Sequence, residues 1–379
     1  MNIGVYRLSM NDPGDVSGLR HLIEDGVVDP ATVVASIGKT EGNGGANDFT
    51  RALASLKVAQ LLAEFLGSSA DEVAERVALV WSGGCEGVLS PHMTVFTRSD
   101  GDAPGVASGK EASLDGDEGQ GRLAISVQRT RPLLPEEVGR MVEVDEVADA
   151  VRRALDDLGS SGDSVHYVQV KGPLLTPAGI ADAAGRGKEV VTTDPNRSKA
   201  YARGASALGV ALGLGEVPRD RLSEGVIAND MDLYSAVAST SAGGELTAAE
   251  VVVFANSPRA GGQFRIGHAS LDDAVDIDGV RSALRSAGLT FGCEPDDGER
   301  ARIQAVFAKA EAPVGGMLRG FRTTMLSDAD INYERHARAA TGAVITAVTG
   351  DSRIFVSGGT EHQAPPGQAP IAAIVRVAD

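Results

Sequence analysis

The sequence repeats one pattern of residues three times, and this repetition constrains the fold more than any other feature of the chain. Each copy contains the motif S-[GA]-G-x-E directly after a run of residues that favour β-structure. The motif occupies residues 82–86, 241–245 and 357–361. We therefore expect each of its serines at or just past the end of a strand, where a turn of small residues follows.

A second predicted strand, which ends near a lysine, precedes each motif, and a predicted helix that opens with an arginine lies between the two. The lysines are Lys39, Lys171 and Lys309, and the arginines are Arg51, Arg203 and Arg338. The order lysine, arginine, serine is the same in every copy, whereas the connecting segments differ in length. Because loops tolerate insertions better than packed elements do, diverged copies of one strand-helix-strand unit should show this pattern.

The repeat divides the chain of 379 residues into three units, predicted at 1–100, 120–256 and 262–379. Residues 101–119 are polar and glycine-rich and are predicted to form a linker, and residues 257–262 a second one. The alternation of strands and helices predicts an α/β or α+β fold, with helices on one face of each sheet.

The composition excludes several classes of protein. A hydrophobic content of 42% excludes a disordered chain, and no apolar run approaches the roughly 18 residues of a membrane span. A net charge of −17 and 4% aromatic residues argue against a nucleic-acid partner. The two cysteines, Cys85 and Cys293, form no disulfide or zinc pattern. Since the N-terminal residues lack a secretory signal, we expect a cytoplasmic protein without membrane contacts.

Any single copy of the motif has a plain structural interpretation, because a serine and glycines after a strand usually form only a turn. The same three residue types on the same elements, three times, favour a shared pocket over a purely structural repeat. If the units pack around a pseudo-threefold axis, their strand ends bring three serines, three lysines and three arginines into one cavity.

This set of side chains is suited to acyl chemistry on an amide. Arginine presents a planar fork of donors to carbonyl oxygens, and a buried lysine beside other cations loses its proton readily. A neutral lysine can act as the base for a serine nucleophile. The backbone N–H groups after the serines, at Gly83, Ala242 and Gly358, can hold an oxyanion. We expect a small flat ring with alternating C=O and N–H groups as substrate and no catalytic cofactor.

Five segments closely resemble the cyclic amide hydrolases, the family of cyanuric acid hydrolase and barbiturase. They are residues 38–44, 82–92, 171–176, 203–212 and 357–363, and the resemblance extends over nearly the whole chain. It implies three similar units arranged as a triangular prism, one central active site and a homotetramer.

The resemblance assigns roles that the repeat alone leaves open. It implies that Ser241 is the nucleophile and Lys171 its base, although the symmetry of the sequence does not distinguish Ser241 from the other two serines. The remaining residues of the pattern are implied to bind and polarise the carbonyls of the ring: Ser82 with Lys39, Ser357 with Lys309, and Arg51, Arg203 and Arg338.

The resemblance also implies a structural cation in the third unit, held by a glutamate and mostly by backbone oxygens of the loop after the last serine. The matching positions are Glu311, Thr360, Gln363, Ala364, Pro365 and Gln368, of which Gln368 stands where the family has glycine. Ligation by oxygen alone suits Mg²⁺ or Ca²⁺, with Na⁺ as an alternative.

The leading hypothesis for function is ring opening of cyanuric acid to a carboxylated biuret that loses CO₂. Barbiturase activity, which gives ureidomalonate, a different cyclic imide, and a non-catalytic threefold scaffold that binds ligands are the alternatives. Glu334 lies one helical turn before Arg338 on a helix predicted to open near Asn332. We expect its carboxylate to hold the guanidinium of Arg338 and to influence ring specificity, unless Glu334 points to solvent.

Overall fold

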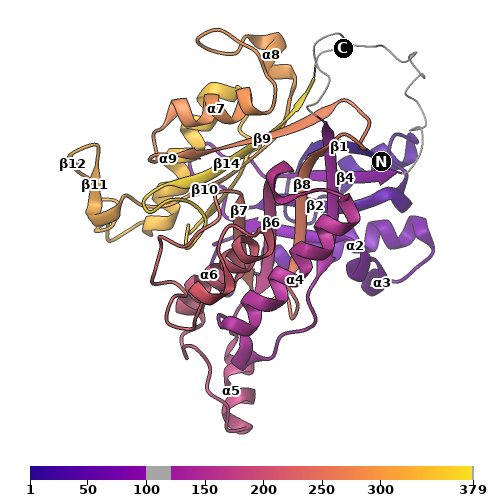
Figure 1. The fold of residues 1–379 in the computed structure, drawn as a ribbon. Helices are drawn as coiled ribbons and strands as arrows, with labels where there is room; N and C mark the ends of the chain where they lie inside the picture. The colour runs from indigo at the N-terminus through magenta and orange to yellow at the C-terminus, as the bar shows by residue number, and fades with distance from the viewer. Residues whose placement is uncertain (100–120, 378–379) are drawn as a thin grey trace.

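The computed structural model describes residues 1–99 and 121–377, so the predicted linker at 101–119 lies outside the described residues (Figure 1). The described chain forms three units of similar build, named here the first (1–99), second (121–257) and third (264–377) unit. The first contains β1 (Asn2–Ser9), α1 (Ser17–Glu24), β2 (Val33–Thr40), α2 (Phe49–Leu66), α3 (Ala70–Arg76), β3 (Ala78–Gly83) and β4 (His92–Ser99).

The second and third units contain the corresponding elements in the same order of strands. The second has β5 (Arg122–Arg129), α4 (Met141–Leu158), β6 (Val165–Pro173), α5 (Pro177–Gly185), α6 (Pro195–Leu214), β7 (Ala238–Gly243) and β8 (Glu250–Ser257). The third has β9 (Phe264–Leu271), α7 (Ile277–Ser286), α8 (Asp297–Ala301), β10 (Ile303–Ala310), β11 (Met317–Leu318), β12 (Phe321–Arg322), α9 (Tyr333–Thr349), β13 (Phe355–Gly358) and β14 (Ala369–Arg376).

Each unit forms a four-stranded sheet with one and the same topology. The strand orders are β1-β4-β2-β3, β5-β8-β6-β7 and β9-β14-β10-β13. In every sheet the lysine strand pairs in parallel with the serine strand at the edge, and the other pairs are antiparallel. The lysine strands β2, β6 and β10 even share an irregularity of register two residues from their start. This confirms the predicted α/β fold of three homologous units.

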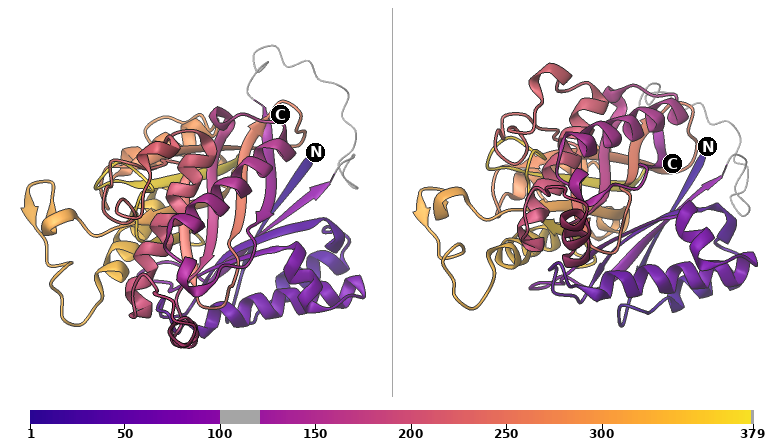
Figure 2. Two further views of the ribbon diagram at one scale, coloured as in Figure 1. Left: turned by 60° about the horizontal axis from the view of Figure 1, so that its bottom comes forward. Right: turned by 90° about the horizontal axis from the view of Figure 1, so that it is seen from below.

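The inner faces of the three sheets pack against one another, whereas the helices cover the outer faces (Figures 1 and 2). One phenylalanine from each unit meets at the centre: Phe96, Phe254 and Phe307. Their ring centroids are 5.2, 6.0 and 6.3 Å apart. Aromatic side chains bury large apolar areas, so this shared core holds the units in a fixed arrangement.

The arginine helices are defined by capping residues in the sequence. Asp48, Asp194 and Asn332 accept backbone hydrogen bonds at the N-termini of α2, α6 and α9, and each of these helices ends at a glycine in the left-handed conformation. Helix α6 packs closely on α4 because Gly209 has no Cβ. A Cβ at this position would lie only 2.7 Å from the Cβ of Val147.

Two predicted details are corrected by the structure. Arg203 and Arg338 do not open their helices: α6 begins at Pro195, so Arg203 lies in its third turn, and α9 begins at Tyr333, so Arg338 lies in its second. Ser82 and Ser357 lie at the strand ends as predicted, each one residue before the last, whereas Ser241 lies two residues inside the end of β7 and the predicted turn begins only after Gly243. In the described part of the chain, no helix is both long and apolar enough to cross a membrane.

Candidate active site

The ends of the three serine strands meet at one cavity, named here the inner cavity. Its lining includes the three serines, the three arginines and Lys171, together with Gly83, Ala242 and Gly358, the residues that follow the serines. The sequence therefore predicted correctly that these strand ends converge. Lys39 and Lys309 do not line the cavity, but they lie directly behind it and donate to Ser82 and to the carbonyl of Gly358, respectively.

Pairing of the lysine strand with the serine strand places each lysine beside its serine. The register aligns Lys39 with Ser82, Lys171 with Ser241 and Lys309 with Ser357. Since side chains of adjacent strands at the same register point to the same face, each lysine lies on the same face as its serine. The parallel β-ladder thus sets a lysine beside a serine in each unit, and within the described residues only Lys39 and Ser82 are hydrogen-bonded to each other.

The three lysines also share one contact with a neighbouring unit. Lys39 donates to the carbonyl of Val356 at 2.7 Å, Lys171 to that of Trp81 at 3.1 Å, and Lys309 to that of Thr240 at 2.7 Å. Each of these carbonyls belongs to the residue just before a motif serine. Every lysine therefore links its own strand to the serine strand of another unit.

Burial determines the protonation of these lysines. It lowers the pKa of Lys39 and of Lys171 to about 8, and it lowers the pKa of Lys309 well below its usual value. The sequence predicted this direction for Lys171 from burial and neighbouring cations; burial is the larger cause, and the neighbouring cation that contributes is Arg51. Neutral amine is therefore accessible near pH 8.

The three serine hydroxyls differ in their hydrogen bonds. Ser82 Oγ accepts a hydrogen bond of 3.3 Å from Lys39 Nζ. Within the described residues, the buried hydroxyls of Ser241 and Ser357 have no hydrogen-bond partner. Ser241 is the least buried of the three residues. Because a buried hydroxyl without a partner carries a desolvation cost, both groups are suited to contact a ligand in the cavity.

The backbone before Ser241 is fixed on both sides by the third unit. The N–H of Thr240 donates to the side chain of Gln363 at 2.7 Å, and its carbonyl accepts from Lys309. Its hydroxyl donates to the carbonyl of Arg203 at 2.8 Å. Three buried hydrogen bonds at one residue hold the following Ser241 in a defined position.

Sequence reasoning missed the function of the glutamate that ends each motif. Glu86, Glu245 and Glu361 form ion pairs with the arginines, and each pair crosses between units. Arg51 pairs with Glu245 at 3.0 Å, Arg203 with Glu361 at 2.7 Å, and Arg338 with Glu86 at 2.6 Å. The signal in the sequence was a glutamate four residues after each serine. Its arginine partner becomes apparent only when the three units of the chain are packed together.

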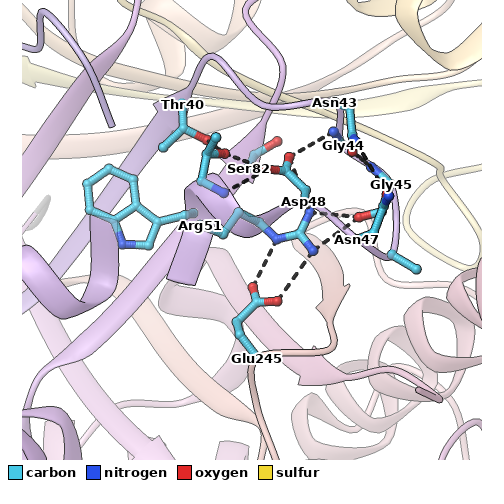
Figure 3. A network of polar contacts seen from close by, with 12 residues as sticks. Thr40, Asn43, Gly44, Gly45, Asn47, Asp48, Arg51, Ser82 and Glu245 are labelled. Carbon is cyan, nitrogen blue, oxygen red and sulfur yellow. Dashed lines mark hydrogen bonds and ion pairs between the residues drawn. The ribbon is translucent and has the colours of Figure 1, made fainter. Parts of the chain in front are cut away.

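Figure 3 shows this arrangement around Arg51. The guanidinium faces the carboxylate of Glu245 on one side and the carbonyl of Gly45 on the other, where both terminal nitrogens donate at 3.2 Å. Asp48 caps the helix and holds the backbone of Gly44. Burial alone would raise the pKa of Glu245, but Lys171 and Arg51 outweigh it and lower the pKa to about 2.

Glu334 departs from the predicted contact. Its carboxylate lies 3.4 Å from Arg203 and 3.5 Å from Lys199, both of the second unit, whereas Arg338 pairs with Glu86. The prediction failed because it considered only neighbours on one helix. The solvent-exposed alternative is also wrong, since Glu334 is buried and lines the inner cavity. Burial would raise its pKa, but Arg203 and Lys199 outweigh this and lower it to about 2.

Two of the six predicted cation ligands, Glu311 and Gln368, line a second small pocket, whereas Thr360, Gln363, Ala364 and Pro365 are not part of its lining. Burial together with Glu361 raises the pKa of Glu311. A partly buried carboxylate under this pressure is suited to a cation. Among the described residues, no three acidic, cysteine or histidine side chains form a metal-binding cluster, so a cation there would depend on backbone oxygens. The side-chain oxygen of Gln363 already accepts a hydrogen bond from the N–H of Thr240. The backbone carbonyl of Gln363 is therefore the oxygen that this residue can offer to a cation.

Comparison with known proteins gives one consistent result. Residues 4–376 match the family described as amidohydrolase ring-opening protein. A cyclic amide hydrolase of Azorhizobium caulinodans is 61% identical, with 99% of this chain and all of the relative covered. Barbiturase 1 of a Nocardioides species is 42% identical, with 98% of each chain covered. A solved structure of cyanuric acid hydrolase is 48% identical, with a TM-score of 0.91 and 99% of each chain covered.

Proposed function

The chain belongs to the ring-opening amidohydrolases, a family of enzymes that hydrolyse cyclic amides, and we propose that it opens a six-membered cyclic imide with Ser241 as nucleophile and Lys171 as base. The observation that carries the proposal is the convergence of three serines, three arginines and Lys171 on one cavity, with Lys39 and Lys309 beside their serines behind it. Cyanuric acid is the ring best supported by the relatives, since an enzyme whose structure is 48% identical acts on it.

In the proposed reaction, the neutral amine of Lys171 accepts the proton of Ser241 Oγ while the oxygen attacks a ring carbonyl carbon. The C–N bond of the ring then breaks, and the ammonium of Lys171 returns the proton to the departing ring nitrogen. The product on Ser241 is an ester of a carbamic acid. Water, activated by the same amine, hydrolyses this ester to carboxybiuret, which loses CO₂ and leaves biuret.

The other parts of the pattern serve binding in this proposal. The arginines and the pairs Ser82–Lys39 and Ser357–Lys309 donate to the ring carbonyls, and the backbone at Ala242 lies where the oxyanion develops. Ser241 is favoured over Ser82 because its hydroxyl has no partner in the described residues, and Thr240 fixes its strand. It is favoured over Ser357 because Lys171, its neighbour in the β-ladder, is the one of the three repeated lysines that lines the inner cavity.

The experiment that tests the proposal is an assay of the purified protein with cyanuric acid and with barbituric acid, followed by product analysis. Biuret and CO₂, or ureidomalonate, should form with the wild type and not with Ser241→Ala. A protein that shifts its melting temperature with these rings but releases no product would instead be a binding scaffold.

Barbituric acid remains the second candidate because of one observation. Glu334 and Lys199 make one wall of the inner cavity different from the other two, whereas cyanuric acid presents three equal edges. Barbituric acid replaces one ring N–H by a methylene and therefore lacks threefold symmetry. Parallel kinetics on the two rings decide between them.

We further propose a structural Mg²⁺ or Ca²⁺ at Glu311, with backbone oxygens of the loop 360–368 as additional ligands. The raised pKa of this buried carboxylate supports a cation there. A cation that binds only the folded state stabilises it by about 2.7 kcal/mol at a concentration of one hundred times Kd. Added Mg²⁺ or Ca²⁺ should raise the melting temperature of the wild type but not of Glu311→Gln, and equal shifts would contradict the site.

We also propose a homotetramer, and the exposed apolar side chains of the arm that carries β11 and β12 support an interface there. Val314 and Phe321 are 75% and 78% exposed, and the arm projects from the body of the third unit (Figure 1). Light scattering of the wild type against Phe321→Ser tests this, and a wild-type monomer would contradict it. A cytoplasmic location stays a prediction.

A further inference from the structure

The position four residues before each arginine breaks the threefold pattern. It holds Asn47 in the first unit, Lys199 in the second and Glu334 in the third. Asn47 is exposed and accepts a hydrogen bond from Asn43. Lys199 and Glu334 both line the inner cavity and pair with each other at 3.5 Å. One wall of the cavity thus carries a charged pair that the other walls lack.

The Lys199–Glu334 pair changes which hydrogen-bond donors the second unit presents to a ring in the inner cavity. Arg203 already binds Glu361 through two hydrogen bonds of 2.7 and 2.8 Å, and Glu334 lies 3.4 Å from its remaining terminal nitrogen. Arg338, in contrast, contacts Glu86 through one nitrogen, and its Nε has no partner among the described residues. A ring with three equal edges would meet three unequal walls. The cavity therefore fits a ring whose edge toward the second unit differs from the other edges.

A larger pocket, named here the outer pocket, opens at this same wall. Its volume is about 730 Å³, and it shares Lys199, Arg203, Glu334 and Arg338 with the inner cavity. Pockets of this size hold whole small-molecule ligands. A substituent on the ring edge that faces Lys199 would thus extend into the outer pocket.

The charges of the outer pocket select the kind of substituent. Five cationic side chains line it, against two carboxylates: Arg197, Lys199, Arg203, Arg335 and Arg338 against Glu334 and Glu361. Both carboxylates are already paired with Arg203, whereas Arg335 and Arg338 pair with Glu86, which does not line the pocket. Lys199 has three N–H donors, and burial lowers its pKa against the opposing effect of Glu334, so a second anion beside it would be stabilising.

We propose that the natural substrate is a cyclic imide with a carboxylate-bearing substituent, which lies in the outer pocket and is bound by Lys199 while the ring occupies the inner cavity. This inference rests on the proposed ring opening and names the class of ring. Glu334 then holds Lys199 and Arg203 in place for the carboxylate. Unsubstituted rings would enter the same cavity without this contact and react less efficiently.

The test compares two substrates that differ only in charge, cyanuric acid with an N-carboxymethyl group and its carboxamide analogue. The corresponding pair of barbituric acids substituted at C5 covers the second ring. The wild type should show a kcat/KM at least tenfold higher for the carboxylate of at least one pair. Lys199→Met keeps the length of the side chain without its charge and should bring this ratio close to one. The control is Lys57→Met on the exposed face of α2, which should keep the wild-type ratio.

The outcomes separate this inference from the proposed function. Equal kcat/KM for carboxylate and carboxamide in both pairs, or an unchanged ratio in Lys199→Met, overturns the inference even if the rings are opened. If no ring is opened, ring hydrolysis fails, and calorimetric binding to Ser241→Ala still decides the carboxylate contact: tighter binding of the carboxylate supports it and equal binding overturns it. Lys199→Gln repeats the measurement if Lys199→Met is unstable.

Discussion

Around the inner cavity, the three lysines repeat one contact about the pseudo-threefold axis, whereas the positions four residues before the arginines hold three different side chains. Each lysine donates to the carbonyl before a serine of another unit. These lysine contacts are named here the symmetric level of the site. The positions four residues before the arginines, named the asymmetric level, hold an asparagine, a lysine and a glutamate.

The difference teaches which part of the site tolerates change. The lysine contacts are buried and satisfy both a cation and a backbone carbonyl, so replacing one member leaves an unpaired polar group in the core. Four residues before the arginines, Asn47 is exposed and the side chains of Lys199 and Glu334 keep 16% and 11% exposure, so new charges are accommodated there at lower cost. Symmetry is kept at the fully buried lysine contacts and is lost at the wall shared with the outer pocket.

The largest expected effect tests whether one of the three serine–lysine pairs, Ser241 with Lys171, carries out the covalent chemistry alone. Ser241→Ala and Lys171→Ala should each lower kcat by at least about a thousandfold, because residues that act as a unit lose nearly all activity together. Ser82→Ala and Ser357→Ala should retain measurable turnover with a higher KM. Steady-state kinetics of the four variants on the active ring measure this. Equal residual rates for all three serine variants would replace the assignment with a symmetric mechanism.

The second prediction concerns the arginine–glutamate pairs. Glu86→Gln should lower the free energy of unfolding by about 3 kcal/mol, because Arg338 is buried and has no other carboxylate within ion-pair distance in the described chain. Glu361→Gln should cost clearly less, since Arg203 keeps Glu334. Urea unfolding monitored by circular dichroism gives both values. A larger loss for Glu361→Gln would contradict this role of Glu334.

The third prediction is a pH profile. In the proposed reaction the base is the neutral amine of Lys171, and its lowered pKa of about 8 means that the neutral fraction grows as the pH rises through 8. The kcat/KM should be about a tenth of its plateau at pH 7 and level off above pH 9. Because Lys39 has a similarly lowered pKa, Lys39→Met serves as the control and should keep the profile. A rate that still climbs at pH 10 would exclude Lys171 as the base.

The smallest expected effect belongs to the asymmetric level. Glu334→Gln removes the charge that holds Lys199 and Arg203, and it should change the ratio of kcat/KM between cyanuric and barbituric acids by roughly three- to tenfold, about 1 kcal/mol. Asn47→Asp at the equivalent position of the first unit is the matched control and should change the ratio less, since Asn47 is exposed. If the two variants behave alike, the charged wall has no part in specificity.

Much of this arrangement could be predicted from the sequence, because the repeat specifies local structure. The strand ends, the serine–lysine pairs and the shared cavity follow from one pattern read three times. The start of α6 was also available, since Asp194 and Pro195 form a typical helix N-terminus, which places Arg203 deep in the helix.

The rest depended on contacts between units, which no local pattern specifies. Glu86 is separated from Arg338 by 252 residues, and Glu334 from Arg203 by 131. A helix-based argument links Glu334 to Arg338 because it considers only residues one turn apart. Packing of the second and third units instead brings Arg203 and Lys199 closer, so the tertiary contact replaced the local one.

The fusion of three units into one polypeptide has an evolutionary consequence for the charged wall. In a ring of three separate identical subunits, every mutation would appear three times, so a lysine at this position would face two more lysines and a glutamate two more glutamates. Copies fused in one polypeptide can change one at a time. The pairing of Lys199 with Glu334 is therefore open to this fused chain and not to a ring of identical subunits, and it gives a threefold arrangement a single distinct direction.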